Sequence, residues 1–442
     1  MTLRWNNFLK KVLKDPKVSK DLKDPHPSKP VPAIMYTLII FFYSLGAHIA
    51  ALFSKKVRLM IKGQHETFDK LRREIDPTQQ YVWVHAASLG EFEQGRPLIE
   101  RIRAEHPHLK ILLTFFSPSG FEVRKNYEGA DVICYLPFDT PLNARRFVRM
   151  ANVKMAFFIK YEFWRNYIAA LHRKNIPVYS VSSIFRPDQI FFRWYGKGYA
   201  KCLRRITHFF VQNDASIELL KTLGITAVTK TGDTRFDRVL DIMNQAKDLP
   251  IVEAFAKGQK VLIAGSSWAP DEDLFIPYFN KRKDLKLVIA PHVVNEAHLS
   301  EIERKLERPT LRYSKATPEQ AAQADCLIID CYGLLSSIYR YATVAYVGGG
   351  FGVGIHNVPE AAVYGCPVLF GPNNKKFKEA QDLIACQGSY EIHNEADFTD
   401  VLTKLLTYDE LLRSSGTAAA NYIRNNAGAR DAIYKEISDI LK

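Results

Sequence analysis

The strongest constraint on the fold is a glycine-rich stretch, Val344–Pro372. Its first four residues form an apolar run with the length of a buried strand. The glycines that follow let the backbone turn tightly and approach a ligand, because no Cβ stands in the way. Asn357 and Pro359 are residue types preferred where a helix begins, and Val368–Phe370 predicts the next strand. The order of strand, glycine loop, helix and strand is typical of a parallel α/β unit whose helix N-terminus faces an anion.

The spacing of Asn357 and Glu360 within this stretch allows two interpretations. A carboxylate three residues into a helix, beside a phosphate-binding turn, can accept hydrogen bonds from ribose hydroxyls. The same spacing also suits an acid that caps its own helix. The residues alone leave both interpretations open.

Length and charge set the wider limits. A chain of 442 residues has room for two or three domains. Its formal net charge of +14 favours an anionic partner, and nucleic acid, membrane phospholipid and a phosphorylated substrate all qualify.

The six cysteines form no CxxC pair, and most stand in apolar runs. We interpret them as buried free thiols of a reducing compartment. The histidines are scattered, with no metal-ligand spacing, so we expect no metal and no cofactor.

The N-terminal region contains a candidate membrane anchor. Residues 1–30 are lysine- and proline-rich and predict a flexible or partly helical basic arm. Val31–Ser54 then contains no charged residue and has basic residues on both sides. Its length could span a bilayer, and a buried helix of a globular domain is the alternative. We therefore predict an anchor over residues 31–57 that spans or lies in the membrane.

From Tyr81 onward, apolar runs alternate with amphipathic segments, which predicts α/β architecture. One series predicts an N-terminal Rossmann-like domain over residues 58–240, and a second predicts a C-terminal one over 241–442, whose last helix packs back on the first domain. A ligand is expected in the cleft that the two domains face. The predicted strands are Tyr81–His85, Ile111–Phe115, Val132–Tyr135, Met155–Ile159, Val178–Val181, Phe209–Val211, Lys260–Ala264, Lys286–Ala290, Cys326–Ile329, Val344–Val347 and Val368–Phe370.

Two acidic motifs follow strands of the first domain. After Tyr81–His85 comes a predicted loop, Ser88–Glu91, which includes Gly90 and in which Glu91 opens the next helix. Glu91 could be a general base that faces the ligand, or it could only compensate the helix dipole. Glu162 follows the strand that ends at Ile159, and it could orient an acceptor or pair with a neighbouring cation.

Hydroxyl groups follow the first strand of the second domain. Ser266 and Ser267 stand at a helix entrance, where hydroxyls and backbone N–H groups suit a phosphate or carboxylate, although Ser267 could be a plain cap. His292 follows the next strand and could reach a nucleotide. A structural role for this lone histidine is the alternative.

Five motifs in this order resemble the Kdo transferases, glycosyltransferases of GT-B fold that attach 3-deoxy-manno-octulosonic acid (Kdo) to the lipid A precursor. They are HAASLGE at 85–91, YEFW at 161–164, TGDTRFD at 231–237, AGSS at 264–267 and GGGFGVGIHNVPEAAVYGCPVLFGP at 348–372. The match runs from about Met35 to the C-terminus.

The resemblance implies an inverting transfer of Kdo from CMP-Kdo to lipid IVA, without a metal. It assigns Glu91 as the catalytic base, Glu162 as a second acid near the acceptor, and Ser88 and Gly90 to an acceptor loop. The positions implied for the donor nucleotide are Ser266, Ser267, His292, Gly349, Gly350, Asn357 and Glu360. It also implies a monomer on the cytoplasmic face of the inner membrane, in contact with anionic lipids and not with nucleic acid.

Some residues depart from the family pattern. Pro291 stands where many members have arginine, Leu334 where they often have glutamate, and Gly350 where serine is common. Lys160 replaces the first acid of the Glu-x-Glu-x-Trp pattern. A sugar-nucleotide epimerase, a transferase acting on another lipid-linked acceptor and an inactive membrane-bound scaffold remain as alternatives.

Overall fold

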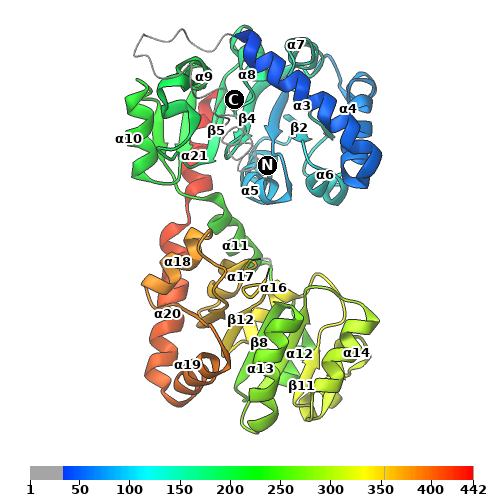
Figure 1. Ribbon diagram of the computed structural model, residues 1–442, viewed down its shortest axis with the longest axis vertical. Coiled ribbons are helices and arrows are strands. Elements are labelled where there is room, and N and C mark those ends of the chain that lie inside the picture. The colour runs from blue at the N-terminus through cyan, green and yellow to red at the C-terminus, as the bar shows by residue number, and fades with distance from the viewer. Residues whose placement is uncertain (1–32, 353, 442) are drawn as a thin grey trace, which may run out of the picture. The chain divides into compact units, whose positions relative to one another are not determined.

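The computed structural model describes residues 33–352 and 354–441 (Figure 1). The basic arm predicted over residues 1–30 lies outside this part of the chain. The described chain divides into two compact units. Unit 1 contains the residues up to Arg238 together with those from Gly428 onward, and unit 2 contains Val239–Ala427. The boundary expected from sequence lay between residues 240 and 241.

Unit 1 is built on a parallel sheet, with seven strands among the described residues, in the order β3-β2-β1-β4-β5-β6-β7. Alternate residues of each strand point to opposite faces, so both faces need a cover of helices. The apolar sides of α4, α7, α8, α9 and α10 cover one face, and α5 and α21 cover the other. The strands are β1 (Tyr81–His85), β2 (Lys110–Phe115), β3 (Val132–Tyr135), β4 (Val153–Ile159), β5 (Val178–Ser183), β6 (His208–Val211) and β7 (Val228–Lys230).

The helices of unit 1 begin with two that lie next to each other in sequence, α3 (Ala33–Phe53) and α4 (Lys55–Glu74). Helix α21 (Ala429–Leu441) returns from the end of the chain and buries Ile433, Ile437 and Leu441 in the unit 1 core. The others are α5 (Leu89–Glu105), α6 (Pro118–Arg124), α7 (Pro141–Met150), α8 (Arg165–His172), α9 (Lys197–Leu203), α10 (Asp214–Thr222) and the first part of α11 (Thr234–Asn244).

Unit 2 has the same design. Its parallel sheet has seven described strands in the order β10-β11-β9-β8-β12-β13-β14. They are β8 (Val261–Ser267), β9 (Lys286–Pro291), β10 (Thr310–Arg312), β11 (Cys326–Ile328), β12 (Val344–Val347), β13 (Val368–Phe370) and β14 (Ser389–Glu391). The helices are α12 (Pro250–Ala256), α13 (Ala269–Lys281), α14 (Glu296–Lys305), α15 (Pro318–Gln323), α16 (Leu335–Ile338), α17 (Val358–Ala362), α18 (Lys378–Ala385), α19 (Glu395–Thr407) and α20 (Asp409–Asn426). The two-domain α/β fold expected from sequence is confirmed.

Three described strands were not predicted: β7, β10 and β14. Each has three residues and lies at the outer edge of its sheet. A segment of three residues shows no periodicity, and an edge strand has one partner, so neither composition nor spacing identifies it.

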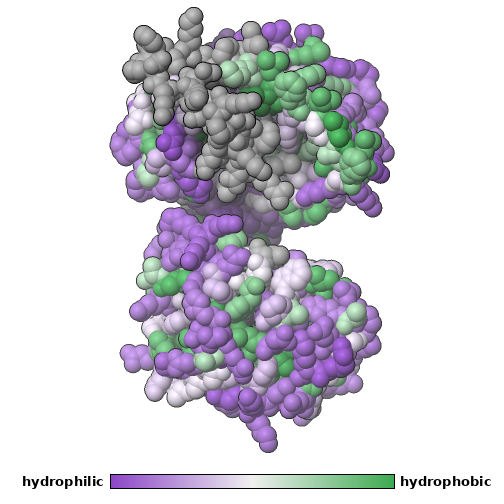
Figure 2. Space-filling model, in the orientation of Figure 1, coloured by the Kyte–Doolittle hydropathy of each residue, from purple (hydrophilic) through white to green (hydrophobic). Residues whose placement is uncertain are grey.

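Helix α3 occupies most of the predicted anchor and has two different sides. Tyr36, Ile40 and Ala47 are buried against unit 1, and the Tyr36 hydroxyl donates a 2.6 Å hydrogen bond to Asp139. The opposite side exposes Met35, Leu38, Phe41, Phe42, Leu45, Ile49, Leu52 and Phe53. Figure 2 shows these hydrophobic side chains gathered along α3.

The anchor predicted over residues 31–57 is not one continuous helix, because α3 ends at Phe53 and α4 begins at Lys55. Arg58 donates to the carbonyl oxygens of Ala51 and Leu52, both at 3.0 Å, and so satisfies the last turn of α3. By length and composition, Met35–Phe53 could cross a membrane.

Candidate active site

The order in which strands are added along the sheet of unit 1 reverses between β1 and β4, and this place is the switch point of the sheet. Strands β2 and β3 continue to one side of β1, and β5, β6 and β7 continue to the other side of β4. In parallel α/β sheets, ligands bind outside the carboxyl ends of the strands at such a switch point. The two segments that leave β1 and β4 carry Glu91 and Glu162, so both acids lie at this edge of the sheet.

Glu91 lies in the first turn of α5, which begins at Leu89. The prediction of a loop over Ser88–Glu91 is therefore wrong from Leu89 onward, although Glu91 does lie in the first turn of the helix, as expected. Gly90 is an exposed residue of this helix. Ser88 is the N-cap residue, but its hydroxyl donates to the carboxylate of Glu91 instead of accepting from the backbone. Glu91 is half-buried and remains reachable for a ligand.

Glu162 lies in the segment between β4 and α8 and is buried, with 4% of its surface exposed. The indole N–H of Trp164 donates to Glu162 Oε2 at 2.7 Å, and His85 Nε2 lies 3.5 Å from the same oxygen. Trp164 also packs on Phe116, with ring centroids 5.0 Å apart. Trp164 therefore both packs on an aromatic neighbour and hydrogen-bonds the acid.

Lys160 turns the chain toward Glu162. Its backbone is in the left-handed region, with φ 66°, its N–H donates to Val181 at 2.7 Å, and its carbonyl oxygen accepts from the Ser183 hydroxyl at 2.7 Å. A non-glycine residue holds such a conformation only where its surroundings fix it. These two hydrogen bonds supply that constraint and place the next residues at the switch point.

The strand order in the sheet of unit 2 reverses between β8 and β12. Two segments meet at this switch point: the serine turn, which is Ser266 and Ser267 at the end of β8, and the glycine loop, which begins at Gly348 after β12. A Cβ on Gly348 would lie 2.4 Å from the carbonyl oxygen of Ser266, and Gly349 donates its N–H to Asp271 at 2.9 Å. Ser266 itself has φ 53°. Only glycine allows the loop to lie so close to this turn.

Ser267 is fully buried, and its hydroxyl donates to Glu272 at 2.9 Å. The second oxygen of Glu272 accepts from His298 at 2.9 Å. The hydroxyl of Ser267 is thus committed to a buried carboxylate, and the backbone of the turn is the part that remains for a ligand. The sequence motif located Ser267 but gave no sign of Glu272 or His298, which come from two different helices.

Three rings form a stack at the same edge of unit 2. His292 stacks on Trp268, with centroids 4.7 Å apart, and on His356, with centroids 4.4 Å apart. The indole N–H of Trp268 donates to His356 at 3.2 Å. Burial, together with the charge of His292, lowers the pKa of His356, which favours its neutral form. The sequence had singled out only His292.

Asn357 is the N-cap residue of α17, as its residue type predicts. Its side chain makes no capping hydrogen bond and instead donates to Glu360 at 2.6 Å. The helix that follows, α17, has only five residues. Asn357 and Glu360 nevertheless lie together beside the glycine loop, where a hydroxyl-bearing ligand could bridge them.

Gly350 is explained by close packing. A Cβ at this position would lie 2.5 Å from the backbone of Gly371, in the segment after β13. Glycine at position 350 thus allows a direct contact between two backbone segments.

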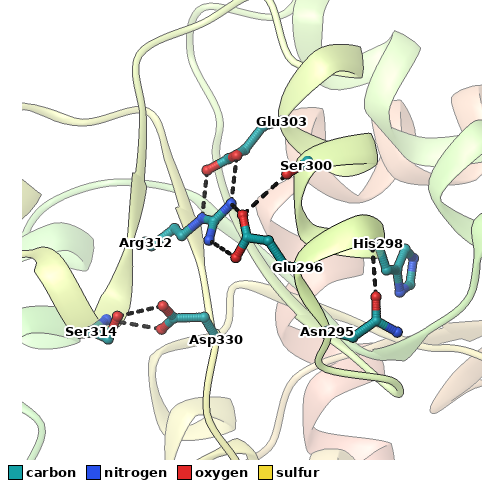
Figure 3. Close-up of polar contacts among 8 residues, drawn as sticks. All are labelled: Asn295, Glu296, His298, Ser300, Glu303, Arg312, Ser314 and Asp330. Atoms are coloured by element: carbon teal, nitrogen blue, oxygen red, sulfur yellow. Dashed lines mark hydrogen bonds and ion pairs between the residues drawn. The ribbon is translucent and has the colours of Figure 1, made fainter.

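A charged network lies at the β10 edge of the unit 2 sheet (Figure 3). Arg312 of β10 makes two-pronged ion pairs with Glu296 and Glu303, all at 2.7–2.8 Å. Asn295 caps α14 by accepting the N–H of His298 at 2.9 Å. Since Arg312 uses its guanidinium to fasten an edge strand to α14, this network is structural.

Comparison with known proteins shows what this chain is similar to. Residues 62–238 match the family described as 3-deoxy-D-manno-octulosonic-acid transferase (kdotransferase). A 3-deoxy-D-manno-octulosonic acid transferase of Aquifex aeolicus is 27% identical over 335 residues, which cover 74% of this chain and 86% of the relative. The protein of the same name from Bordetella pertussis is 27% identical over 407 residues, which cover 86% and 93%.

Among solved structures, the UDP-GlcNAc 2-epimerase of Neisseria meningitidis in complex with UDP-GlcNAc has a TM-score of 0.58 at 16% identity, over 81% of this chain and 100% of that one. At that identity the likeness shows the fold alone. The fold and the two switch points define the class of this protein, a two-domain α/β protein with a fold of the GT-B type. Within this class, the chain resembles the Kdo transferases, a family of glycosyltransferases, both in residues 62–238 and in the relatives that match most of its length.

Proposed function

We propose that this enzyme transfers Kdo from CMP-Kdo to a glucosamine hydroxyl of lipid IVA, with inversion at the anomeric carbon. The observation that carries the proposal is the place of Glu91 and Glu162 directly after the two strands that flank the switch point of unit 1. The names of the relatives support the donor sugar.

In the proposed reaction, Glu91 takes the proton of the acceptor hydroxyl as its oxygen attacks the anomeric carbon. The bond between that carbon and the phosphate oxygen breaks, and CMP leaves with the electron pair. The hydrogen bond from Ser88 fixes the orientation of the Glu91 carboxylate before the acceptor arrives. Burial of Glu162 beside Trp164 supports its role as the second acid, which orients the acceptor.

We assign donor binding to the edge of unit 2 where the serine turn meets the glycine loop. Backbone N–H groups near Ser266 and Gly350 would hold the phosphate, and the hydrogen bond from Gly349 to Asp271 would keep the glycine loop in place beside them. The ring of His292 and the pair formed by Asn357 and Glu360 would hold the base and the ribose. CMP leaves with a single phosphate, so fixed dipoles can stabilise it, and we propose that no metal is required.

The two sides of α3 support binding to an anionic membrane surface. The side with Tyr36 and Ile40 is packed against unit 1, so only the opposite side is available to lipid. We propose that α3 lies in the bilayer interface rather than crossing it, with basic residues of α4 such as Lys55 and Lys56 near the headgroups. The enzyme would act as a monomer on the cytoplasmic face of the inner membrane.

The test is a transfer assay that uses CMP-Kdo generated in situ and detects products by mass spectrometry. Three incubations compare lipid IVA, a lipid-linked peptidoglycan precursor and UDP-GlcNAc alone, each with and without EDTA. Kdo-bearing lipid IVA formed equally well in EDTA is the expected result. Kdo on the other lipid would correct the acceptor, epimerised UDP-GlcNAc would replace the proposed activity, and loss of product in EDTA would overturn metal independence.

A further inference from the structure

A chain of buried polar groups lies behind Glu162. We define the His85 network as Trp83, Thr114, His85, Glu162 and Trp164. Three of them, Trp83, His85 and Thr114, are fully buried on β1 and β2, and His85 is in register with Thr114. No residue of this network except Glu162 was assigned a function by the sequence motifs.

The network contacts both ring nitrogens of His85. The Thr114 hydroxyl accepts from the Trp83 indole at 2.8 Å and lies 2.8 Å from His85 Nδ1. On the other side of the ring, His85 Nε2 accepts from the Trp164 indole N–H at 3.1 Å and lies 3.5 Å from Glu162 Oε2. The fully buried ring is therefore held between β2 and the segment that carries Glu162.

The rings of Trp164 and His85 both lie against the same oxygen of the acid. The Trp164 N–H, which His85 Nε2 also accepts, donates to Glu162 Oε2 at 2.7 Å, and His85 Nε2 lies 3.5 Å from that oxygen. Among the described residues, neither ring forms a hydrogen bond with Oε1. One carboxylate oxygen is therefore held from inside the domain, while the other is left for a ligand.

We propose that His85 is a positioning residue, which holds the carboxylate of Glu162 so that Oε1 faces the acceptor hydroxyl. This inference rests on the proposed transferase function. His85 does not touch the substrate and acts through Trp164 and Glu162, as second-layer groups orient the ligands of metal sites. The aromatic packing of Trp164 on Phe116 limits movement of the indole that donates to Glu162.

A matched pair of substitutions separates the two contacts of the ring. The amide of His85→Asn reaches the Nδ1 position and keeps the contact with Thr114, but it loses the contact with Trp164 and Glu162. The longer amide of His85→Gln reaches the Nε2 position and keeps an acceptor for the Trp164 N–H. We expect kcat in His85→Asn to fall about 10- to 100-fold with little change in KM for CMP-Kdo, and His85→Gln to recover most of the activity.

Trp164→Phe gives a second measurement that keeps the ring and removes only the N–H donor, and the same loss of kcat is expected. The midpoint of urea unfolding and the affinity for CMP serve as controls for folding. Equal activity of His85→Asn and His85→Gln, or a fully active Trp164→Phe, overturns the positioning role while the transferase activity of the wild type stands. A wild type without activity overturns the proposed function itself, and this inference with it.

Discussion

Glu272 and His298 form a buried acid–base pair beside the serine turn. Both nitrogens of His298 contact acceptors, the Glu272 carboxylate at 2.9 Å and the carbonyl oxygen of Val293 at 3.1 Å. An imidazole that donates at both nitrogens carries a positive charge. Burial opposes that charge, but the hydrogen bond and charge of Glu272 outweigh it, so the pKa of His298 is raised.

The first prediction concerns the pH dependence of stability. The folded-state pKa of His298 exceeds the unfolded value of about 6.5. The stabilisation by the charged ring is therefore fully present below pH 6.5 and is lost as the pH rises through the folded-state pKa. His298→Gln should lower the free energy of unfolding by about 2 kcal/mol at pH 6 and by less at pH 8.5, as measured by urea denaturation.

His393→Gln is the matched control, because His393 also pairs with an acid, Glu391, at 3.0 Å, but it is exposed to solvent. Its effect should be small at both pH values. If the cost of His298→Gln were the same at pH 6 and pH 8.5, the charged state inferred for His298 would be wrong.

The second prediction concerns the glycine loop. A methyl group at position 350 would lie 2.5 Å from the Gly371 backbone, whereas a Cβ at Gly352 meets nothing within 4 Å. Gly350→Ala should therefore destabilise unit 2 by about 1–3 kcal/mol and weaken CMP binding, and Gly352→Ala should do neither. Calorimetric titration with CMP measures the binding, and equal affinities for the two variants would contradict the assigned donor site.

At the scale of the element, α3 is the part whose behaviour is most open to test. Its outer side exposes Phe41 and Phe42 at 58% and 64%. The third prediction is that replacing both with Asn weakens co-sedimentation with vesicles of anionic phospholipid more than tenfold, because each buried Phe contributes about 1.5–3 kcal/mol. The unfolding midpoint should not change, since neither side chain packs in the core.

Tyr408→Asn is the control for α3, because Tyr408 is 61% exposed and belongs to unit 2. It should leave vesicle binding unchanged. Undiminished binding of the α3 variant would mean that another surface contacts the membrane.

The long central strands could be predicted from sequence because each is a continuous apolar run. Pairing across the fold could not. His85 contacts a residue 79 positions away, and Ser267 reaches His298 only through Glu272. The motifs singled out Glu91 and Glu162, the two acids at the switch point of unit 1. The start of α5 at Leu89 was missed because Ser88 and Gly90 are typical loop residues.

At the scale of the whole molecule, the chain uses one architecture twice and assigns a different chemistry to each copy. The switch point of unit 1 carries two carboxylates, which suit an acceptor hydroxyl, and that of unit 2 carries a glycine loop, which suits a phosphate. The chain then returns to unit 1 through α21, whose Ile433 and Ile437 are fully buried in its core. Unit 1 is therefore complete only when the whole chain has been made.

The central claim is that Glu91 is the base of the transfer, and the fourth prediction tests it. Wild type, Glu91→Gln and Glu91→Ala are incubated with CMP-Kdo and lipid IVA, and Kdo-bearing lipid is counted by mass spectrometry. Loss of a general base should lower the rate by about 10²- to 10⁴-fold in both variants, with CMP affinity retained. Product from the wild type alone is the result this account predicts, and equal product from all three proteins would contradict it.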